Sequence, residues 1–204
     1  MSGLCRIVAA GDFAAERFRA ACAAQPEALL IAADAGLLHL QSLDVRPDLF
    51  VGDADSLGAQ PEGLACVALP TVKDDTDTLA AVREGLRRGC DRFEIYGALG
   101  GKRFSHSLAN LQTLLFLKAR NAQGCLLDAD CTVYALQNET ATVDNACFFS
   151  LFAADGEAIV SVRNAKYDLI YHRLRPSFPL GVSNEPRGCA EITVHSGSVY
   201  LIAE

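Results

Sequence analysis

The chain has 204 residues, of which 50% are hydrophobic and 21% are charged, so it is long enough to bury one large core or two small ones. Its 18 Lys and Arg residues are outnumbered by 25 Asp and Glu residues, which gives a net charge of -7. This balance excludes nucleic acid as the main partner, because phosphate backbones are bound by clustered Lys and Arg side chains. It does not exclude a nucleotide, since a bound divalent cation masks nearby carboxylates.

The N-terminal segment and the cysteines indicate the cellular compartment of the protein. The apolar run at residues 7–10 is too short for the core of a signal peptide, and no apolar stretch has the length that spans a bilayer. The eight cysteines contain no Cys-x-x-Cys pair, which disfavours a zinc site. Their number would allow a disulfide framework, but a chain without a signal peptide is expected to keep its thiols reduced. We therefore expect a cytoplasmic protein without a membrane partner.

The first part of the chain alternates short apolar runs with helical patterns. The apolar runs predict strands at residues 6–10, 28–33, 48–51, 65–69, 93–96 and 124–127. Apolar residues three and four positions apart predict helices at residues 13–24, 37–43, 78–88 and 107–120, the last with Leu108, Leu111, Leu114 and Leu115 facing inward. This alternation predicts an α/β fold in which a mostly parallel, Rossmann-like sheet carries helices on both faces.

From about residue 132 the helical period disappears. Short β-rich runs follow at residues 132–136, 146–152, 158–163, 166–171, 190–195 and 198–202, and turn residues separate several of them. This pattern predicts a small all-β sandwich or barrel, and we expect Phe148, Phe149 and Phe152 in its core. We therefore expect two domains, at residues 1–131 and 132–204.

Acidic residues follow one of the predicted strands and precede one of the predicted helices. Asp53 and Asp55 are two positions apart directly after the strand at residues 48–51, and ligands of parallel sheets bind beyond the carboxyl ends of the strands. Two convergent carboxylates suit a hard cation such as Mg²⁺, and Asp77 is a candidate third ligand. Alternatively, such Asp residues cap helices and close turns, which is the favoured interpretation for Asp74 and Asp75 taken alone.

A glycine-rich segment separates the strand at residues 93–96 from the next helix. Gly97, Gly100 and Gly101 would let the backbone approach a phosphate, and Lys102 and Arg103 would add positive charge. A plain left-handed turn explains the same glycines nearly as well.

Five segments, taken in chain order, resemble the motifs of the thiamine pyrophosphokinase family. They are Ala33-Asp34-Ala35-Gly36, Gly52-Asp53-Ala54-Asp55-Ser56, Lys73-Asp74-Asp75-Thr76-Asp77, Gly100-Gly101-Lys102-Arg103-Phe104-Ser105-His106 with Asn110 downstream, and Val182-Ser183-Asn184-Glu185. The resemblance spans nearly the whole chain. It implies an α/β domain followed by a β-sandwich, which the periodicity also predicts.

The resemblance also implies a role for each matching residue. Asp53, Asp55 and Asp77 would bind Mg²⁺, Lys73 would contact the phosphates of ATP, and Asp34 would contact the nucleotide. Arg103 and Asn110 would line the place where phosphate and substrate meet, in a binding site that includes Asp74, Gly100, Gly101, Ser105 and His106. Ser183 and Asn184 would lie on the thiamine side and come from a second subunit, which implies a homodimer with shared active sites.

The sequence departs from the family motifs at three positions. Ala35 replaces a glycine, Lys102 is inserted before Arg103, and Ser105 stands where the family has an Asp. In the family that carboxylate helps to hold the aminopyrimidine of thiamine, whereas Ser105 can form hydrogen bonds but carries no charge.

The resemblance implies a Mg²⁺-dependent enzyme that transfers a diphosphate group from ATP to the hydroxyl of thiamine and releases AMP. Two alternatives use the same residues. A Mg²⁺-dependent phosphohydrolase would activate water instead of an alcohol, and a non-catalytic thiamine-binding protein would retain the site without turnover.

Overall fold

The computed structural model describes residues 3–53, 63–68, 75–144 and 148–204 of the chain. They form two compact units, unit 1 over Met1–Ala129 and unit 2 over Asp130–Glu204. No disulfide joins the seven cysteines in the described ranges. Within the same ranges, no helix combines the length and the apolar character that crossing a bilayer requires.

Unit 1 is a mixed α/β structure, as the alternating pattern predicts. Its elements are β1 (Gly3–Val8), α1 (Ala15–Ala24), β2 (Leu29–Ala33), α2 (Gly36–Ser42), β3 (Leu49–Gly52), β4 (Cys66–Ala68), α3 (Asp77–Arg87), β5 (Cys90–Tyr96), α4 (Phe104–Lys118) and β6 (Gln123–Leu127). Each predicted strand and helix of this part of the chain is present, with ends displaced by a few residues.

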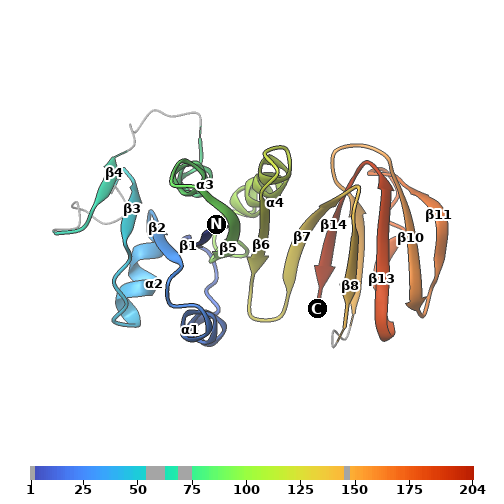
Figure 1. Ribbon diagram of the computed structural model, residues 1–204, viewed down its shortest axis with the longest axis horizontal. Helices are drawn as coiled ribbons and strands as arrows, with labels where there is room; N and C mark the ends of the chain where they lie inside the picture. The colour runs from blue at the N-terminus through green and yellow to red at the C-terminus, as the bar shows by residue number, and fades with distance from the viewer. Residues whose placement is uncertain (1–2, 54–62, 69–74, 145–147) are drawn as a thin grey trace. The chain divides into compact units, whose positions relative to one another are not determined.

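The strands of unit 1 pair in parallel in the order β6-β5-β1-β2-β3-β4. Figure 1 shows α1 and α2 on one face of these strands and α3 and α4 on the other. Phe18 of α1 and Leu40 of α2 share a buried cluster with Val8, Ala32 and Phe50 of the strands. Both faces of the strands are therefore covered, which explains why their sequences are nearly continuous apolar runs.

A buried ion pair joins the neighbouring strands β1 and β5 of unit 1. Arg6 of β1 is opposite Glu94 of β5 in the parallel register, and its side chain is only 3% exposed. Its Nε donates to Glu94 Oε2 at 2.7 Å and its Nη1 donates to the carbonyl oxygen of Gln25 at 2.7 Å. The charge is thus both paired and hydrogen-bonded, as burial requires.

The buried face of α4 differs from the expectation. Leu108 was expected to face inward but is 49% exposed, whereas Leu114 and Leu117 are buried together with Ser107 and Asn110. The prediction for Leu108 was therefore wrong. The cause is that the first turns of α4 cover the polar loop after β5, where polar side chains find hydrogen-bond partners, and only its later turns cover apolar strand residues.

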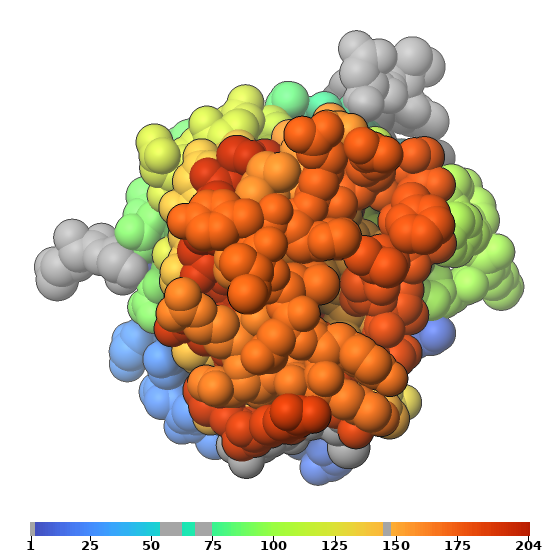
Figure 2. Space-filling model, turned by 90° about the vertical axis from the view of Figure 1, so that its right-hand side faces the viewer, coloured from blue at the N-terminus to red at the C-terminus, as the bar shows by residue number. Residues whose placement is uncertain are grey.

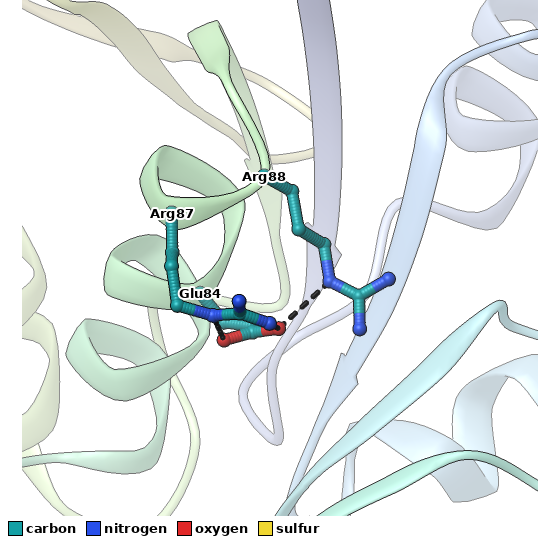
Figure 3. A network of polar contacts seen from close by, with 3 residues as sticks. All are labelled: Glu84, Arg87 and Arg88. Atoms are coloured by element: carbon teal, nitrogen blue, oxygen red, sulfur yellow. Dashed lines mark hydrogen bonds and ion pairs between the residues drawn. The ribbon is translucent and has the colours of Figure 1, made fainter.

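A second charged cluster closes the C-terminal end of α3, and Figure 3 shows its three side chains. Arg87 donates to both carboxylate oxygens of Glu84, at 2.8 Å and 2.7 Å, and Arg88 Nε donates to Glu84 Oε1 at 2.7 Å. These hydrogen bonds, from Arg87 first and then from Arg88, lower the pKa of Glu84 from 4.5 to about 2.

The stability of unit 1 should depend on the ionisation of Glu84. Because the pKa is lower in the folded chain than in the unfolded one, the stabilisation is fully present above pH 4.5 and disappears as the pH falls from 4.5 towards 2. We expect Glu84→Gln to remove about 1–2 kcal/mol from the free energy of unfolding at pH 7, a figure reduced for the solvent-exposed arginines. Urea unfolding at a series of pH values should show a smaller loss between pH 4.5 and pH 2 in the variant; equal losses in both proteins would contradict this role.

Unit 2 is entirely β-structure. Its strands are β7 (Thr132–Gln137), β8 (Thr140–Val143), β9 (Phe149–Ala153), β10 (Ala158–Ala165), β11 (Leu169–Leu174), β12 (Gly181–Asn184), β13 (Pro186–Ser196) and β14 (Ser198–Ala203). Two of these, β8 and β12, were not expected from the sequence.

The strands of unit 2 form two antiparallel sets, in the orders β12-β9-β14-β7 and β11-β10-β13-β8. Buried residues from both sets, such as Leu151 and Leu201 of the first and Val160 and Ile192 of the second, belong to one hydrophobic cluster. Phe149 lies in this core as expected, but Phe148 is 43% exposed, which contradicts its predicted place there. The difference follows from the alternation of side chains along an extended segment, which sends neighbouring residues to opposite faces.

Candidate functional site

The carboxyl ends of β1 and β5 mark the place where the strand order of unit 1 reverses. From β1 the chain continues outward to β2, β3 and β4 on one side, whereas β5 and β6 lie on the other side. Ligands of open parallel sheets bind outside the carboxyl ends of the strands at such a reversal. The segments after β1, β2, β3 and β5 are therefore the candidate site.

Two glycines let the segments after β1 and β5 touch. The backbone N–H of Gly11 donates to the carbonyl oxygen of Gly97 at 2.7 Å, and that of Asp12 donates to the carbonyl oxygen of Leu99 at 2.9 Å. A Cβ atom on Gly97 would collide with the carbonyl oxygen of Ala9, and one on Gly11 with that of Leu99. Gly97 also has a φ of 63°, in the left-handed region.

We expect Gly97→Ala to destabilise unit 1 by about 3 kcal/mol and to lower activity, because the added Cβ meets backbone that cannot yield. Gly89→Ala is the matched control. Gly89 has a φ of 86° but nothing within 4 Å of its Cβ position, so the control carries only the backbone strain, about 1 kcal/mol. Chemical denaturation of both variants measures the difference, and equal losses would show that the contact between the segments contributes nothing.

Gly100, Gly101 and the start of α4 form a surface suited to an anion. Gly100 and Gly101 have φ values of 66° and 73°, and α4 begins at Phe104 without a side-chain hydrogen bond from its N-cap, Arg103. The N–H groups of a helix's first turn bind anions when no side chain caps them. The side chains of Lys102, Arg103, Ser105 and His106 are exposed around this helix end.

Asn110 of α4 binds the loop at residues 97–101, which we call the glycine loop. Its Nδ2 donates to the carbonyl oxygen of Ala98 at 2.7 Å, and the side chain is buried. Ser107 Oγ, one turn earlier in α4, donates to the carbonyl oxygen of Gly100 at 3.4 Å. In this structure Asn110 therefore contacts the loop.

Asp34 follows β2 directly and has a φ of 49°. Its backbone N–H donates to the carbonyl oxygen of Val51 at 3.0 Å, which fixes it between the ends of β2 and β3. Two residues later, Gly36 starts α2 so close to β1 that a Cβ atom would collide with the carbonyl oxygen of Val8. The Asp34 segment thus joins the same edge of unit 1.

Asp53 and Asp77 are half-buried and lie at the ends of two elements of unit 1. Asp53 follows β3, and Asp77 is the first residue of α3, whose N-cap Thr76 accepts a hydrogen bond from the Leu79 N–H. A helix that connects two parallel strands begins at their carboxyl edge, so Asp77 lies on the edge that carries Asp53. Asp55, Lys73 and Asp74 lie outside the described residues.

Asp75 forms an ion pair with Arg83 of α3. Its Oδ2 lies 2.5 Å from Arg83 Nη1, and Arg83 also lies near the Phe116 ring, with its Cζ 5.5 Å from the ring centroid. The Asp75 carboxylate thus forms its ion pair with a side chain of α3. Among the described residues, no group of three or more His, Cys, Asp or Glu side chains is arranged to hold a metal ion.

Ser183 and Asn184 are the last residues of β12 in unit 2. Ser183 is exposed and has a φ of 55°, and its N–H donates to Ser150 Oγ at 3.0 Å. Asn184 is 8% exposed and bonds to the backbone of Tyr167.

Gly11 and Asp12 belong to the candidate site but were not predicted from the sequence. A Cβ atom on Gly100 would collide with the Asp12 carboxylate, which places that carboxylate against the glycine loop. The available signal was a Gly-Asp pair directly after an apolar strand, the same pattern as Gly52-Asp53.

Residues 22–126, just over half of the chain, match the family model described as thiamin pyrophosphokinase, catalytic domain. The chain belongs to the thiamin pyrophosphokinase family. The matched segment contains the carboxyl ends of β2, β3 and β5 but not that of β1. It is a thiamin pyrophosphokinase catalytic domain. The resemblance noted in the sequence is thereby confirmed.

Solved structures of thiamin pyrophosphokinases share the fold over both units. The enzyme from Bacillus subtilis is 21% identical, with a TM-score of 0.86 and 98% of each chain covered. The one from Geobacillus thermodenitrificans is 22% identical, with a TM-score of 0.83 and coverage of 98% of this chain and 97% of that one. Yeast thiamin pyrophosphokinase is 14% identical, with a TM-score of 0.80 and coverage of 100% and 86%. Comparison with curated protein sequences finds no match.

Proposed function

We propose that this chain transfers the terminal diphosphate group of ATP to the hydroxyl of thiamine, which yields thiamine diphosphate and AMP. The observation that carries the proposal is the match of residues 22–126 to the catalytic domain of the family. In this reaction the thiamine oxygen forms a bond to the β-phosphorus and its hydroxyl proton is released to solvent. The bond between the α,β-bridging oxygen and that phosphorus breaks, and AMP takes the electron pair.

The acidic residues of unit 1 fit a Mg²⁺ ion. Carboxylate oxygens are its preferred protein ligands, and Asp53 and Asp77 lie at one edge of the sheet. Asp55, two residues after Asp53, would complete the set that the family resemblance implies. When bound, Mg²⁺ neutralises negative charge on the phosphates.

The phosphates of ATP have a second, positively charged partner in the start of α4. The N–H groups of Gly100 and Gly101, the first turn of α4 and the side chain of Arg103 offer donors where negative charge develops. Lys73 would also contact these phosphates, and Asp74 would lie in the same binding site. Catalysis then depends on the positioning of the two substrates and on electrostatic stabilisation of the transition state, which are the main requirements of phosphoryl transfer.

The remaining site residues would contact the nucleotide and thiamine. We assign Asp34 to the nucleotide, and Asn110 to the support of the glycine loop through Ala98. Ser105 and His106, in the first turn of α4, would contact thiamine. Because Ser105 brings no charge, its contact with the aminopyrimidine would be a neutral hydrogen bond.

We also propose a homodimer in which Ser183 and the Asn184 segment of one subunit complete the site of the other. Large apolar side chains at the surface support an interface. They include Phe104 at the start of α4 and, in unit 2, Tyr167, Ile170, Tyr171, Phe178, Leu180 and Val182. Figure 2 views unit 2 from the side of β10, β11 and β13. Large exposed apolar patches mark interaction surfaces, and these unit 2 side chains are candidates for such a patch.

Light scattering should give twice the monomer mass, and a fully active monomer would contradict the shared site. Mixing an inactive unit 1 variant, Asp77→Ala, with an inactive unit 2 variant of Ser183 should restore part of the activity, because one site of each mixed dimer is then intact.

The finer description of the fold belongs to the same proposal. It is a Rossmann-like α/β domain at residues 1–131 that binds ATP, followed by a β-sandwich at residues 132–204 that faces thiamine. We place the enzyme in the cytoplasm, which the absence of disulfides among the described cysteines supports.

Incubation of the pure protein with ATP, Mg²⁺ and thiamine, followed by chromatography, tests the function. We expect AMP and thiamine diphosphate in equal amounts, and neither without Mg²⁺. ADP or phosphate without a thiamine product would favour a phosphohydrolase, and bound thiamine without turnover would favour a non-catalytic binding protein.

A further inference from the structure

The side chain of Asn184 forms a clamp on the backbone of Tyr167. Its Oδ1 accepts hydrogen bonds from the N–H of Tyr167 at 3.0 Å and from the N–H of Glu185 at 2.9 Å, and its Nδ2 donates to the carbonyl oxygen of Tyr167 at 2.8 Å. Three of the four hydrogen-bonding positions of the amide are thus occupied by backbone. The side chain is also buried, at 8% exposure.

Further bonds hold the same two segments together. The N–H of Lys166 donates to the carbonyl oxygen of Glu185 at 2.8 Å, and Lys166 Nζ lies 2.6 Å from Glu185 Oε1. Asp168 Oδ1 accepts from the N–H of Ala165 at 2.9 Å, which closes the turn at residues 165–168. The backbone of Tyr167 is therefore fixed, whereas its side chain is 61% exposed.

A fixed and exposed aromatic ring suits the chemistry of thiamine. The aminopyrimidine is flat and aromatic, and the thiazolium carries a permanent positive charge. An aromatic ring binds the first by stacking and the second by cation–π attraction.

We propose that Asn184 is a positioning residue that acts on thiamine only through Tyr167. Asn184 holds the backbone of Tyr167 so that the ring is presented to a flat ring of the substrate, and the Asn184 amide does not itself touch thiamine. This inference rests on the proposed function, and it replaces the direct contact that the family resemblance implies for Asn184.

A double-mutant cycle with Asn184→Ala and Tyr167→Ala tests the proposal. Each single variant should raise the KM for thiamine at least about fivefold, with the KM for ATP and kcat changed less than about twofold. The double variant should match Tyr167→Ala within about twofold, because residues that act in series are not additive. A double variant whose KM rises by the product of the two single effects would overturn the proposal, as would an unchanged KM in Asn184→Ala.

Asn184→Asp is a second variant that keeps the shape and both accepting bonds. It replaces the Nδ2 donor by a carboxylate oxygen that faces the Tyr167 carbonyl oxygen, so two acceptors repel each other and its KM for thiamine should be at least as high as that of Asn184→Ala. An Asp variant with the KM of the wild type would contradict the clamp.

Hydrogen exchange gives a readout that does not depend on activity. The N–H of Tyr167 should exchange at least about tenfold faster in Asn184→Ala but keep its protection in Tyr167→Ala, whose backbone clamp is intact. A Tyr167 amide that is unprotected in the wild type would overturn the proposal. A wild-type chain that forms no thiamine diphosphate contradicts the proposed function instead, and the exchange result then still decides whether the clamp exists.

Discussion

Asp77→Ala is expected to lower the rate of thiamine diphosphate formation by on the order of a thousandfold while leaving both units folded. Asp77 would supply a carboxylate to Mg²⁺, and an alanine cannot replace it. The helix itself should still form, because its N-cap is Thr76 rather than Asp77. Steady-state assays across Mg²⁺ concentrations, with circular dichroism for the fold, measure both effects. Activity within tenfold of the wild type would contradict the proposal that Asp77 binds Mg²⁺.

Asp75→Asn is the matched control for this experiment. Asp75 lies two residues before Asp77, but its carboxylate is paired with Arg83. Since Arg83 is more than half exposed, the pair contributes little to stability, about 0–1 kcal/mol. We expect activity within about threefold of the wild type. A loss as large as that of Asp77→Ala would mean that the whole segment, and not Asp77, is what the reaction requires.

Arg6→Ala is expected to have the largest effect on stability, a loss of about 3 kcal/mol or more. The substitution leaves Glu94 without its partner between β1 and β5, removes the bond to the Gln25 carbonyl oxygen and opens a cavity. Urea unfolding at neutral pH measures the change in the free energy of unfolding.

Arg19→Ala removes a comparable ion pair at the surface. Arg19 and Glu16 are 54% and 89% exposed, so the expected change is below about 0.5 kcal/mol. If Arg6→Ala costs no more than Arg19→Ala, burial of the Arg6 pair does not stabilise unit 1.

The α/β part of the fold could be predicted because its strands are covered on both faces. Runs such as residues 28–33 are then apolar throughout and stand out from the amphipathic helices between them. The inward face of α4 could not be predicted in the same way. Ser107 and Asn110 are buried because the loop after β5 offers carbonyl oxygens as hydrogen-bond partners. Hydropathy alone predicts instead that Leu108 is buried and that these polar residues are exposed.

The strands of unit 2 were harder to locate where their side chains are polar or exposed. β8 has the sequence Thr-Ala-Thr-Val and β12 the sequence Gly-Val-Ser-Asn, and neither shows a run of apolar residues. Both belong to sheets because their backbones pair with β13 and β9. Such pairing is set by distant segments, which a local pattern does not reveal.

The site was predictable where a residue type is unusual for its position. Asp34 and Asp53 directly after apolar strands, and glycines before α4, were predicted to lie at one edge of unit 1, and the structure places them there. The partners of Asn184 and Asn110 could not be predicted. Each bonds to backbone 12 or more positions away in the chain, and only the folded structure brings these atoms together.

The place of β14 in unit 2 has a consequence for how the protein is made. β14 (Ser198–Ala203) pairs with β7 on one side and β9 on the other, so it fills the middle of its sheet. A nascent chain that has emerged only as far as residue 190 therefore has β7 and β9 with no strand between them. Unit 1 can fold during translation, whereas unit 2 has to wait for residues about 70 positions beyond the start of β7. A ribosome that stalls late should consequently hold a finished α/β unit and an open β unit with exposed strand edges, the state most prone to aggregation.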